Sequence, residues 1–244
     1  MRKIQEIFYR VRVWILWFVV VLVFLYILLS PDTHFKIGNV FFGGVPALYN
    51  VTLANFFFAR ATNPIVGSIP PFAHHQLSRT YFIRGQLDVA LAEAQKELEI
   101  YPEHWNTYYI IGLTLGYMNR EKEAIEAFGT FIEHKPESWA AKNDKAWLQF
   151  RIGDIDGALA TLLPVATSTE NPWVQNTYGT LLLNKGRYQE AREAFENAQR
   201  VADSMTEEAW GRAYPGNDPR VYGTGLQAMR LSIASNLKLL EGKQ

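Results

Sequence analysis

Apolar residues recur every three to four positions along most of the chain, and the stretches with this period come in pairs. In residues 105–136, two such stretches flank a turn at Asn119, with Gly112 in the first stretch and Ala124 in the second. This period predicts amphipathic helices. Two short helices cannot bury apolar surface on both sides of their pair, so the segment requires similar pairs before and after it.

Small residues recur with one period along the chain. In the second helix of each expected pair they are Ala90, Ala124, Ala158 and Ala191, in steps of 34, 34 and 33 residues. In the first helix, with the same steps, they are Ser78, Gly112, Ala146 and Gly179. The turns between the helices carry Gly85, Asn119, Gly153 and Gly186, which tolerate the left-handed backbone of a helix end. These positions predict four copies of one helical unit.

This pattern resembles the tetratricopeptide repeat (TPR), a helix–turn–helix unit of about 34 residues. The resemblance covers approximately residues 71–203, and the second and fourth copies match the family best. The first copy departs from it with Ala94 and Glu97, where the family favours an aromatic and a small residue. The third has Pro164 within its second helix, which predicts a kinked or shortened helix.

Residues 13–29 are seventeen consecutive apolar residues. At about 1.5 Å per residue they span roughly 26 Å as a helix, close to the bilayer hydrocarbon thickness of about 30 Å. We interpret this segment as a single transmembrane helix. The main alternative is a cleaved signal peptide, but the apolar run is longer than such peptides usually have and lacks a small-x-small ending.

The charges around this segment predict its orientation. Residues 1–12 contain four basic side chains, whereas Lys36 is the only Lys or Arg between residues 30 and 59. The positive-inside rule then places the N-terminus in the cytosol and the repeats outside it. The expected location is single-pass in a membrane, with a bacterial inner membrane and a periplasmic or cell-surface side favoured.

The remaining segments complete the expected organisation. Residues 31–70 contain Gly38, Gly43-Gly44 and Phe56 in approximate phase with the repeats, and predict a divergent repeat with a two-residue insertion in its turn, or else an irregular juxtamembrane helix. After a loop at 214–219, a one-sided apolar stripe predicts a C-terminal capping helix at Tyr222, Leu226, Met229, Ile233, Leu237 and Leu240. The expected boundaries are 1–12, 13–29, 31–70, the four repeats 71–104, 105–138, 139–171 and 172–203, and 204–244.

The expected fold class is therefore all-α: a TPR-like α-solenoid of helix–turn–helix repeats, preceded by one transmembrane helix and closed by a C-terminal capping helix. Composition adds little to this picture. The formal net charge is zero, with 24 basic and 24 acidic side chains, which gives no reason to expect nucleic-acid binding. The acidic residues Glu93 and Glu97 are expected on solvated faces of their helix.

No motif for catalysis or cofactor binding is present. The chain has no cysteine, which excludes disulfides, zinc–thiolate sites and thiol nucleophiles. It has no Gly-rich phosphate loop, no G-x-S-x-G and no H-E-x-x-H, and its histidines lack the spacing of a helical metal site. We expect no enzyme activity, no metal and no cofactor.

The resemblance implies a peptide-binding groove lined by the first helices. Aromatic rings supply contact area at low entropy cost, and asparagine amides can bond an extended backbone. The residues expected to contact a peptide or partner are Phe82, Asn106, Tyr109, Leu113, Tyr117, Asn143, Trp147, Phe150, Trp173 and Asn176. For each aromatic taken alone, the alternative is packing between repeats.

These expectations describe a membrane-anchored TPR scaffold that binds a peptide or partner protein, another membrane or envelope protein above all. The alternatives are a structural subunit of a membrane complex or homo-oligomer, and an accessory factor that positions an envelope enzyme. The sequence does not identify the partner.

Overall fold

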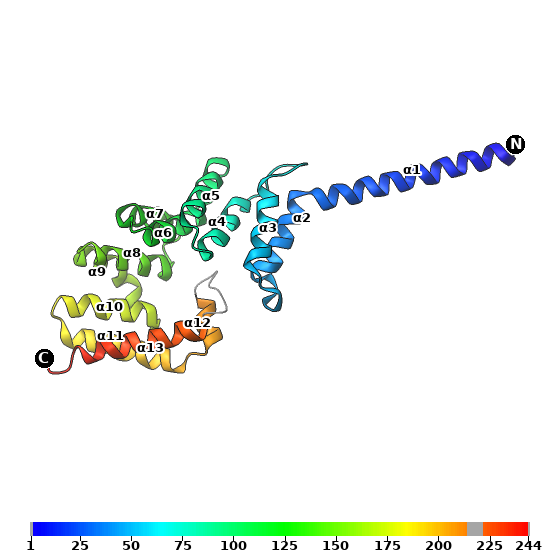
Figure 1. Cartoon of the computed structure of the whole chain (residues 1–244). Helices are drawn as coiled ribbons and strands as arrows, with labels where there is room; N and C mark the ends of the chain where they lie inside the picture. The colour runs from blue at the N-terminus through cyan, green and yellow to red at the C-terminus, as the bar shows by residue number, and fades with distance from the viewer. Residues whose placement is uncertain (1, 214–221, 244) are drawn as a thin grey trace. The chain divides into compact units, whose positions relative to one another are not determined.

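The computed structural model describes residues 2–213 and 222–243, and in this part of the chain every regular element is helical. The elements are α1 (Arg2–Leu29), α2 (Pro31–Asn39), α3 (Val51–Thr62), α4 (Ala73–Ile83), α5 (Leu87–Ile100), α6 (Asn106–Tyr117), α7 (Glu121–His134), α8 (Trp139–Arg151), α9 (Ile155–Ala166), α10 (Pro172–Asn184), α11 (Tyr188–Ser204), α12 (Glu207–Ala213) and α13 (Tyr222–Lys238) (Figure 1). A π-helical turn, η1 (Val40–Gly44), and a short 3-10 turn, η2 (Pro46–Leu48), connect α2 to α3. The predicted all-α solenoid is confirmed.

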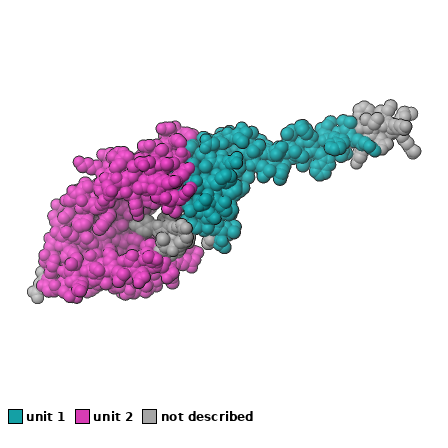
Figure 2. Space-filling model, in the orientation of Figure 1, with its two compact units in different colours: residues 1–80 teal, residues 81–244 magenta. Residues whose placement is uncertain are grey.

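The chain divides into two compact units, residues 1–80 and 81–244, with the boundary inside α4 (Figure 2). Unit 1 contains α1 and the hairpin of α2 and α3. Unit 2 contains the helix pairs α6–α7, α8–α9 and α10–α11, which stack in sequence and end in α12 and α13. Each first helix packs against its own second helix and against the preceding pair, which is the arrangement expected of a solenoid.

One turn geometry closes each helix pair. The turn residues all have positive φ: Gly85 (72°), Asn119 (59°), Gly153 (85°) and Gly186 (74°). In each turn, the amide of the next residue donates to the carbonyl five positions earlier, at 2.9–3.0 Å. This bond satisfies a carbonyl that the end of the first helix leaves free. The predicted recurrence of Gly or Asn in the turns is thus explained by one backbone conformation.

The two helices of a pair meet where a small residue faces a large one. A Cβ added to Gly112 would lie 2.9 Å from the ring of Phe128, and one added to Gly179 would lie 2.7 Å from the ring of Phe195. Both rings are buried. In the third pair the corresponding residues are Ala146 and Leu162, both fully buried in one core cluster. Compared with the glycine–phenylalanine contacts, the small residue of the third pair is larger by one methyl group and the large residue is smaller.

The α2–α3 hairpin makes the same kind of contact, but in a different register from the one predicted. Phe58 is fully buried, and a Cβ on Gly38 would lie 2.6 Å from its ring, whereas Phe56 is half exposed. Gly38 and Phe58 are 20 positions apart, compared with 16 for Gly112 and Phe128. The predicted insertion of two residues is wrong; it is four residues, because η1 and η2 lengthen the turn.

The expectation that Glu93 and Glu97 are solvated is also wrong, since Glu93 is only 8% exposed and Glu97 is fully buried. Oε1 of Glu97 lies 2.6 Å from Nδ1 of His104. Tyr101 stacks on the same imidazole at 4.7 Å between ring centroids. Glu97 occupies the repeat position that Phe131 fills in the next copy, so a hydrogen-bonded pair replaces an apolar ring there. A buried carboxylate requires such a partner.

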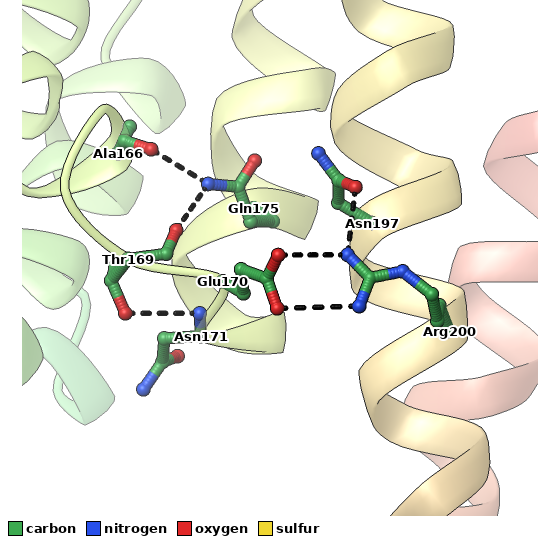
Figure 3. Close-up of polar contacts among 7 residues, drawn as sticks. All are labelled: Ala166, Thr169, Glu170, Asn171, Gln175, Asn197 and Arg200. Atoms are coloured by element: carbon green, nitrogen blue, oxygen red, sulfur yellow. Dashed lines mark hydrogen bonds and ion pairs between the residues drawn. The ribbon is translucent and has the colours of Figure 1, made fainter.

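Helix α9 is shorter than its counterparts, as Pro164 suggests. It has 12 residues and ends two residues after the proline, whereas α7 has 14 and α11 has 17. The loop that follows α9 is held by polar contacts (Figure 3). The side-chain amide of Gln175 donates to the carbonyls of Ala166 and Thr169, both at 2.7 Å. These bonds hold the loop against the start of α10.

An ion pair joins the same loop to α11. The guanidinium of Arg200 donates two hydrogen bonds to Glu170, at 3.0 and 3.2 Å (Figure 3). These bonds lower the pKa of Glu170, and the carboxylate raises the pKa of Arg200. The two side chains are 58% and 67% exposed, and an ion pair so open to solvent contributes little to the stability of the fold.

Helix α13 packs against α11 and closes the end of the last repeat. Leu226, Ile233 and Leu240 of the predicted stripe are buried. The guanidinium of Arg230 in α13 donates hydrogen bonds to the carbonyls of Ala202, Asp203 and Met205 and so caps the end of α11. The side chain of Tyr222 and the loop at 214–219 lie outside the described residues.

Candidate partner-binding surface

The first helices of the repeats form one continuous layer in unit 2. Helix α6 contacts α8, and α8 contacts α10, so side chains on these helices belong to one surface. Nine of the ten predicted contact residues are on α6, α8 and α10, and Phe82 is at the end of α4.

Two of the ten residues are large exposed aromatics. Tyr117 is 69% exposed and Trp147 is 45% exposed. Beyond α1, among the side chains that the structure describes, the only other exposed Phe, Tyr or Trp is Phe56. Exposed rings on a packed helical layer are unusual, so they make this layer a candidate interaction surface.

Each exposed ring rests on a second predicted residue. Tyr117 meets Phe82 edge to face, with 5.2 Å between ring centroids. Trp147 lies against Phe150 at 5.4 Å, and Phe150 packs on the core cluster shared by α8, α9 and α10. Since their neighbours restrict them, these rings lose less side-chain freedom when a partner binds.

Tyr109 and Leu113 lie deeper, between repeats. The ring of Tyr109 contacts Phe128 and Phe131, at 5.5 and 5.3 Å, and its hydroxyl donates to Oδ2 of Asp144 at 2.9 Å. Leu113 packs on the core cluster of α5 to α8. Tyr109 therefore ties α6 to α8. Asp144 was not identified from the sequence, because nothing in its spacing distinguishes it from a solvated carboxylate.

The three asparagines differ in their surroundings. Asn106 is exposed at the start of α6, whereas Asn143 is only 7% exposed. Oδ1 of Asn176 accepts a hydrogen bond from Nδ2 of Asn236 in α13 at 3.0 Å. The capping helix thus occupies Asn176, and Asn106 is the one of the three whose side chain is open to a peptide backbone.

Trp173 belongs to a row of three tryptophans. Its ring centroid lies 5.7 Å from that of Trp139 and 6.0 Å from that of Trp210. Trp139 and Trp210 were not among the predicted residues. A signal for Trp139 exists, since Trp105, Trp139 and Trp173 are spaced by 34 residues. Trp210 is in α12, outside the repeats, where no period can indicate it.

Two bidentate ion pairs begin second helices at equivalent positions. Arg120 donates to Glu123, and Arg187 to Glu190, with N–O distances of 2.6–2.7 Å. The hydrogen bonds lower the pKa of each glutamate and raise that of each arginine. Any stability from these exposed pairs is present at neutral pH and is lost as acid protonates the glutamates.

The titratable side chains of the described residues are scattered and form no metal-binding cluster. These residues contain no group of three or more His, Asp or Glu side chains placed to hold a metal ion. Glu97 is buried in the first repeat, and its hydrogen bond with His104 supports the fold of that repeat. The first-helix layer exposes the rings of Tyr117 and Trp147 and the side-chain amide of Asn106.

Comparison with known proteins agrees with this architecture. Residues 109–167 and 174–204 each match a family model of the tetratricopeptide repeat. These residues form tetratricopeptide repeats. The TPR models cover the second, third and fourth predicted copies, and a search of curated proteins found no match.

Several solved TPR structures have the same fold. TTC0263, a thermophilic TPR protein of Thermus thermophilus, is 17% identical, with a TM-score of 0.59 over 85% of this chain and 99% of that one. YrrB, described as a TPR protein with an unusual peptide-binding site, is 16% identical, with a TM-score of 0.57 over 71% and 87%. A MamA double mutant from RS-1 is 16% identical, with a TM-score of 0.60 over 70% and 98%. At these identities the likeness shows the fold alone.

Proposed function

We propose that this chain is a membrane-anchored TPR scaffold that binds a peptide or partner protein through the first-helix layer of its repeats, outside the cytosol. The observation that carries the proposal is the exposure of Tyr117 and Trp147, each supported by a half-buried ring. YrrB, which is described as a TPR protein with an unusual peptide-binding site, supports a binding role for this fold.

Helix α1 supports the membrane anchor. Residues Arg10–Leu29 have a mean hydropathy of 2.6, and none of this stretch is buried within the chain. A helix that is apolar on every face is stable in lipid rather than in water. A signal sequence has the same composition, but the seventeen-residue apolar run favours retention of the helix as an anchor.

Anchoring also makes a moderate affinity sufficient. A binding surface fixed at a bilayer meets partners in the same membrane at a raised effective concentration. With N-terminal basic residues on the cytosolic side, the repeats would meet extracytoplasmic segments of such proteins. The mechanism is binding alone, with no cofactor and no enzyme activity.

The surface is tested by removing both exposed rings. The double variant Tyr117→Ala and Trp147→Ala should capture the partner at least about ten-fold less well, equivalent to about 1.4 kcal/mol, because exposed aromatics often dominate binding. Capture is measured as the protein cross-linked to the tagged chain in native membranes and quantified by mass spectrometry. Circular dichroism should show unchanged helix content.

The matched control is Ile100→Ala with Leu163→Ala. These two side chains are 44% and 46% exposed, but they belong to the second helices α5 and α9. The control variant should capture the partner as the unaltered chain does. Equal capture by the Tyr117/Trp147 variant would refute the proposed surface.

A further inference from the structure

The hairpin of unit 1 returns the chain to the end of helix α1. Only Ser30 separates α1 from α2, and α3 runs back beside α2. The loop after α3 then lies against the first residue of α2, since a Cβ added to Gly67 would be 3.5 Å from Cδ of Pro31 (Figure 1). Residues 63–69 are thus level with the point where the apolar helix ends.

That level lies in the interfacial layer of a bilayer that α1 spans. The apolar run ends at Leu29, and its length of roughly 26 Å does not exceed the hydrocarbon core of about 30 Å. The headgroup layer beyond the core is about 5–7 Å thick on each side. Pro31 is two residues beyond the run. Pro31 and the loop beside it are therefore expected within the headgroup layer or close to it.

The loop has the composition of an interfacial segment. No Asp, Glu, Lys or Arg occurs from Ala61 to Ser78. Ile65 is 70% exposed, and it is two residues from the Gly67 that contacts Pro31. Moving so exposed an isoleucine side chain out of water lowers the free energy.

A cation lies one turn before this loop. Arg60, in the last turn of α3, is exposed, and its guanidinium lies 5.3 Å from the ring centroid of Phe56. It forms no ion pair with any residue that the structure describes. Burial, and then the nearby guanidinium of Arg60, lower the pKa of His34 at the same end of the hairpin. The acidic residue at this end of the hairpin is Asp32, in the first turn of α2, and it is not paired with Arg60.

We propose that residues 63–69 and Arg60 form a second membrane contact, in which Ile65 enters the interfacial layer and Arg60 binds lipid phosphates. This inference rests on the proposed anchor. A lipid surface fits better than a protein partner because the contact of the loop with Pro31 fixes its depth beside the anchor. The contact would restrain the hairpin against the bilayer, so that it does not swing freely about Ser30.

The absence of cysteine allows a direct depth measurement on the full chain. Single cysteines at Ile65, Val21 and Leu48 carry a spin label, and each variant is placed in nanodiscs of phosphatidylcholine and phosphatidylglycerol. Val21 is in the middle of the apolar run, and Leu48 is an exposed residue in η2, at the opposite end of the hairpin. Relative accessibility to oxygen and to a water-soluble nickel chelate reports depth.

The label at position 65 should be protected from the nickel chelate, the one at 21 should be in hydrocarbon, and the one at 48 should be in water. Adding Arg60→Gln should lower the ratio of protected to exposed label at position 65 by about five-fold, the equivalent of about 1 kcal/mol per basic residue at an anionic surface. If position 21 is in hydrocarbon but 65 is as accessible as 48, the second contact is refuted and the anchor stands. If position 21 is accessible from water, the anchor itself is wrong.

Discussion

Replacing Phe195 with alanine should lower the free energy of unfolding by about 3–5 kcal/mol. The ring is fully buried between α10 and α11, against Gly179, and belongs to the core cluster that also holds Ile233 of the capping helix. Its loss would leave a cavity at the point where the last repeat and its cap meet. Because neighbouring repeats stabilise each other, the defect should be felt first at this end of the solenoid.

Urea unfolding followed by circular dichroism measures the total loss, and amide hydrogen exchange locates it. Protection should fall in α10, α11 and α13 before it falls in α6 and α7. Trp147→Ala is the control, because it also removes a large ring but one that is 45% exposed. A loss for Phe195→Ala no larger than that of the control would contradict the packing described here.

The second large effect is a coupling between helices α6 and α7. Gly112→Ala and Phe128→Leu should each destabilise the fold, since the added methyl group collides with the ring and the smaller side chain leaves a void. Together they reproduce Ala146 and Leu162 of the third repeat. The double variant should therefore recover about 1–2 kcal/mol relative to the sum of the single losses.

Gly116→Ala provides the control for this cycle. It adds the same methyl group to the same helix, but its Cβ would meet Leu148 at 3.4 Å and not Phe128. Combined with Phe128→Leu, it should give an additive result. The measurement is again urea unfolding of each variant in one detergent. Additivity for the pair Gly112 and Phe128 would mean that the size of one residue does not set the size of the other.

The period of small residues was enough to predict the repeats because it follows from the helix contacts themselves. Gly112 and Gly179 recur where a ring must fit, and a glycine, or Asn119 in the second copy, recurs where the backbone must turn left-handed. The same reasoning gave the wrong length for the insertion in residues 31–70, two residues instead of four. Phe56 and Phe58 are two positions apart, and only their burial shows which of them packs on Gly38.

The surface could be predicted only in part. Tyr117 and Trp147 are exposed on first helices, where the repeat pattern placed them. Whether an aromatic or amide side chain is open or covered, however, depends on segments outside the period. Trp210 in α12 packs on Trp173, and Asn236 in α13 donates a hydrogen bond to Asn176. Neither contact has a signature in the spacing of the repeats.

Glu97 shows a different reason for failure. A charged residue on a helix is usually solvated, and the exception depends on a partner that can share its hydrogen bond. His104 is seven positions further along the chain, beyond the end of α5. The chain brings the two together only after α5 has ended, so the helical pattern by itself gives no sign of the pair.

Site-specific photo-crosslinking in native membranes tests the central proposal most directly. A photoreactive amino acid is placed at position 117 or 147 on the first-helix layer, or at Glu126, an exposed residue on the second helix α7. We predict that positions 117 and 147 cross-link to the same protein and that position 126 does not. Cross-linking to a protein from position 126, with none from 117 or 147, would contradict the proposal that this layer is the binding surface.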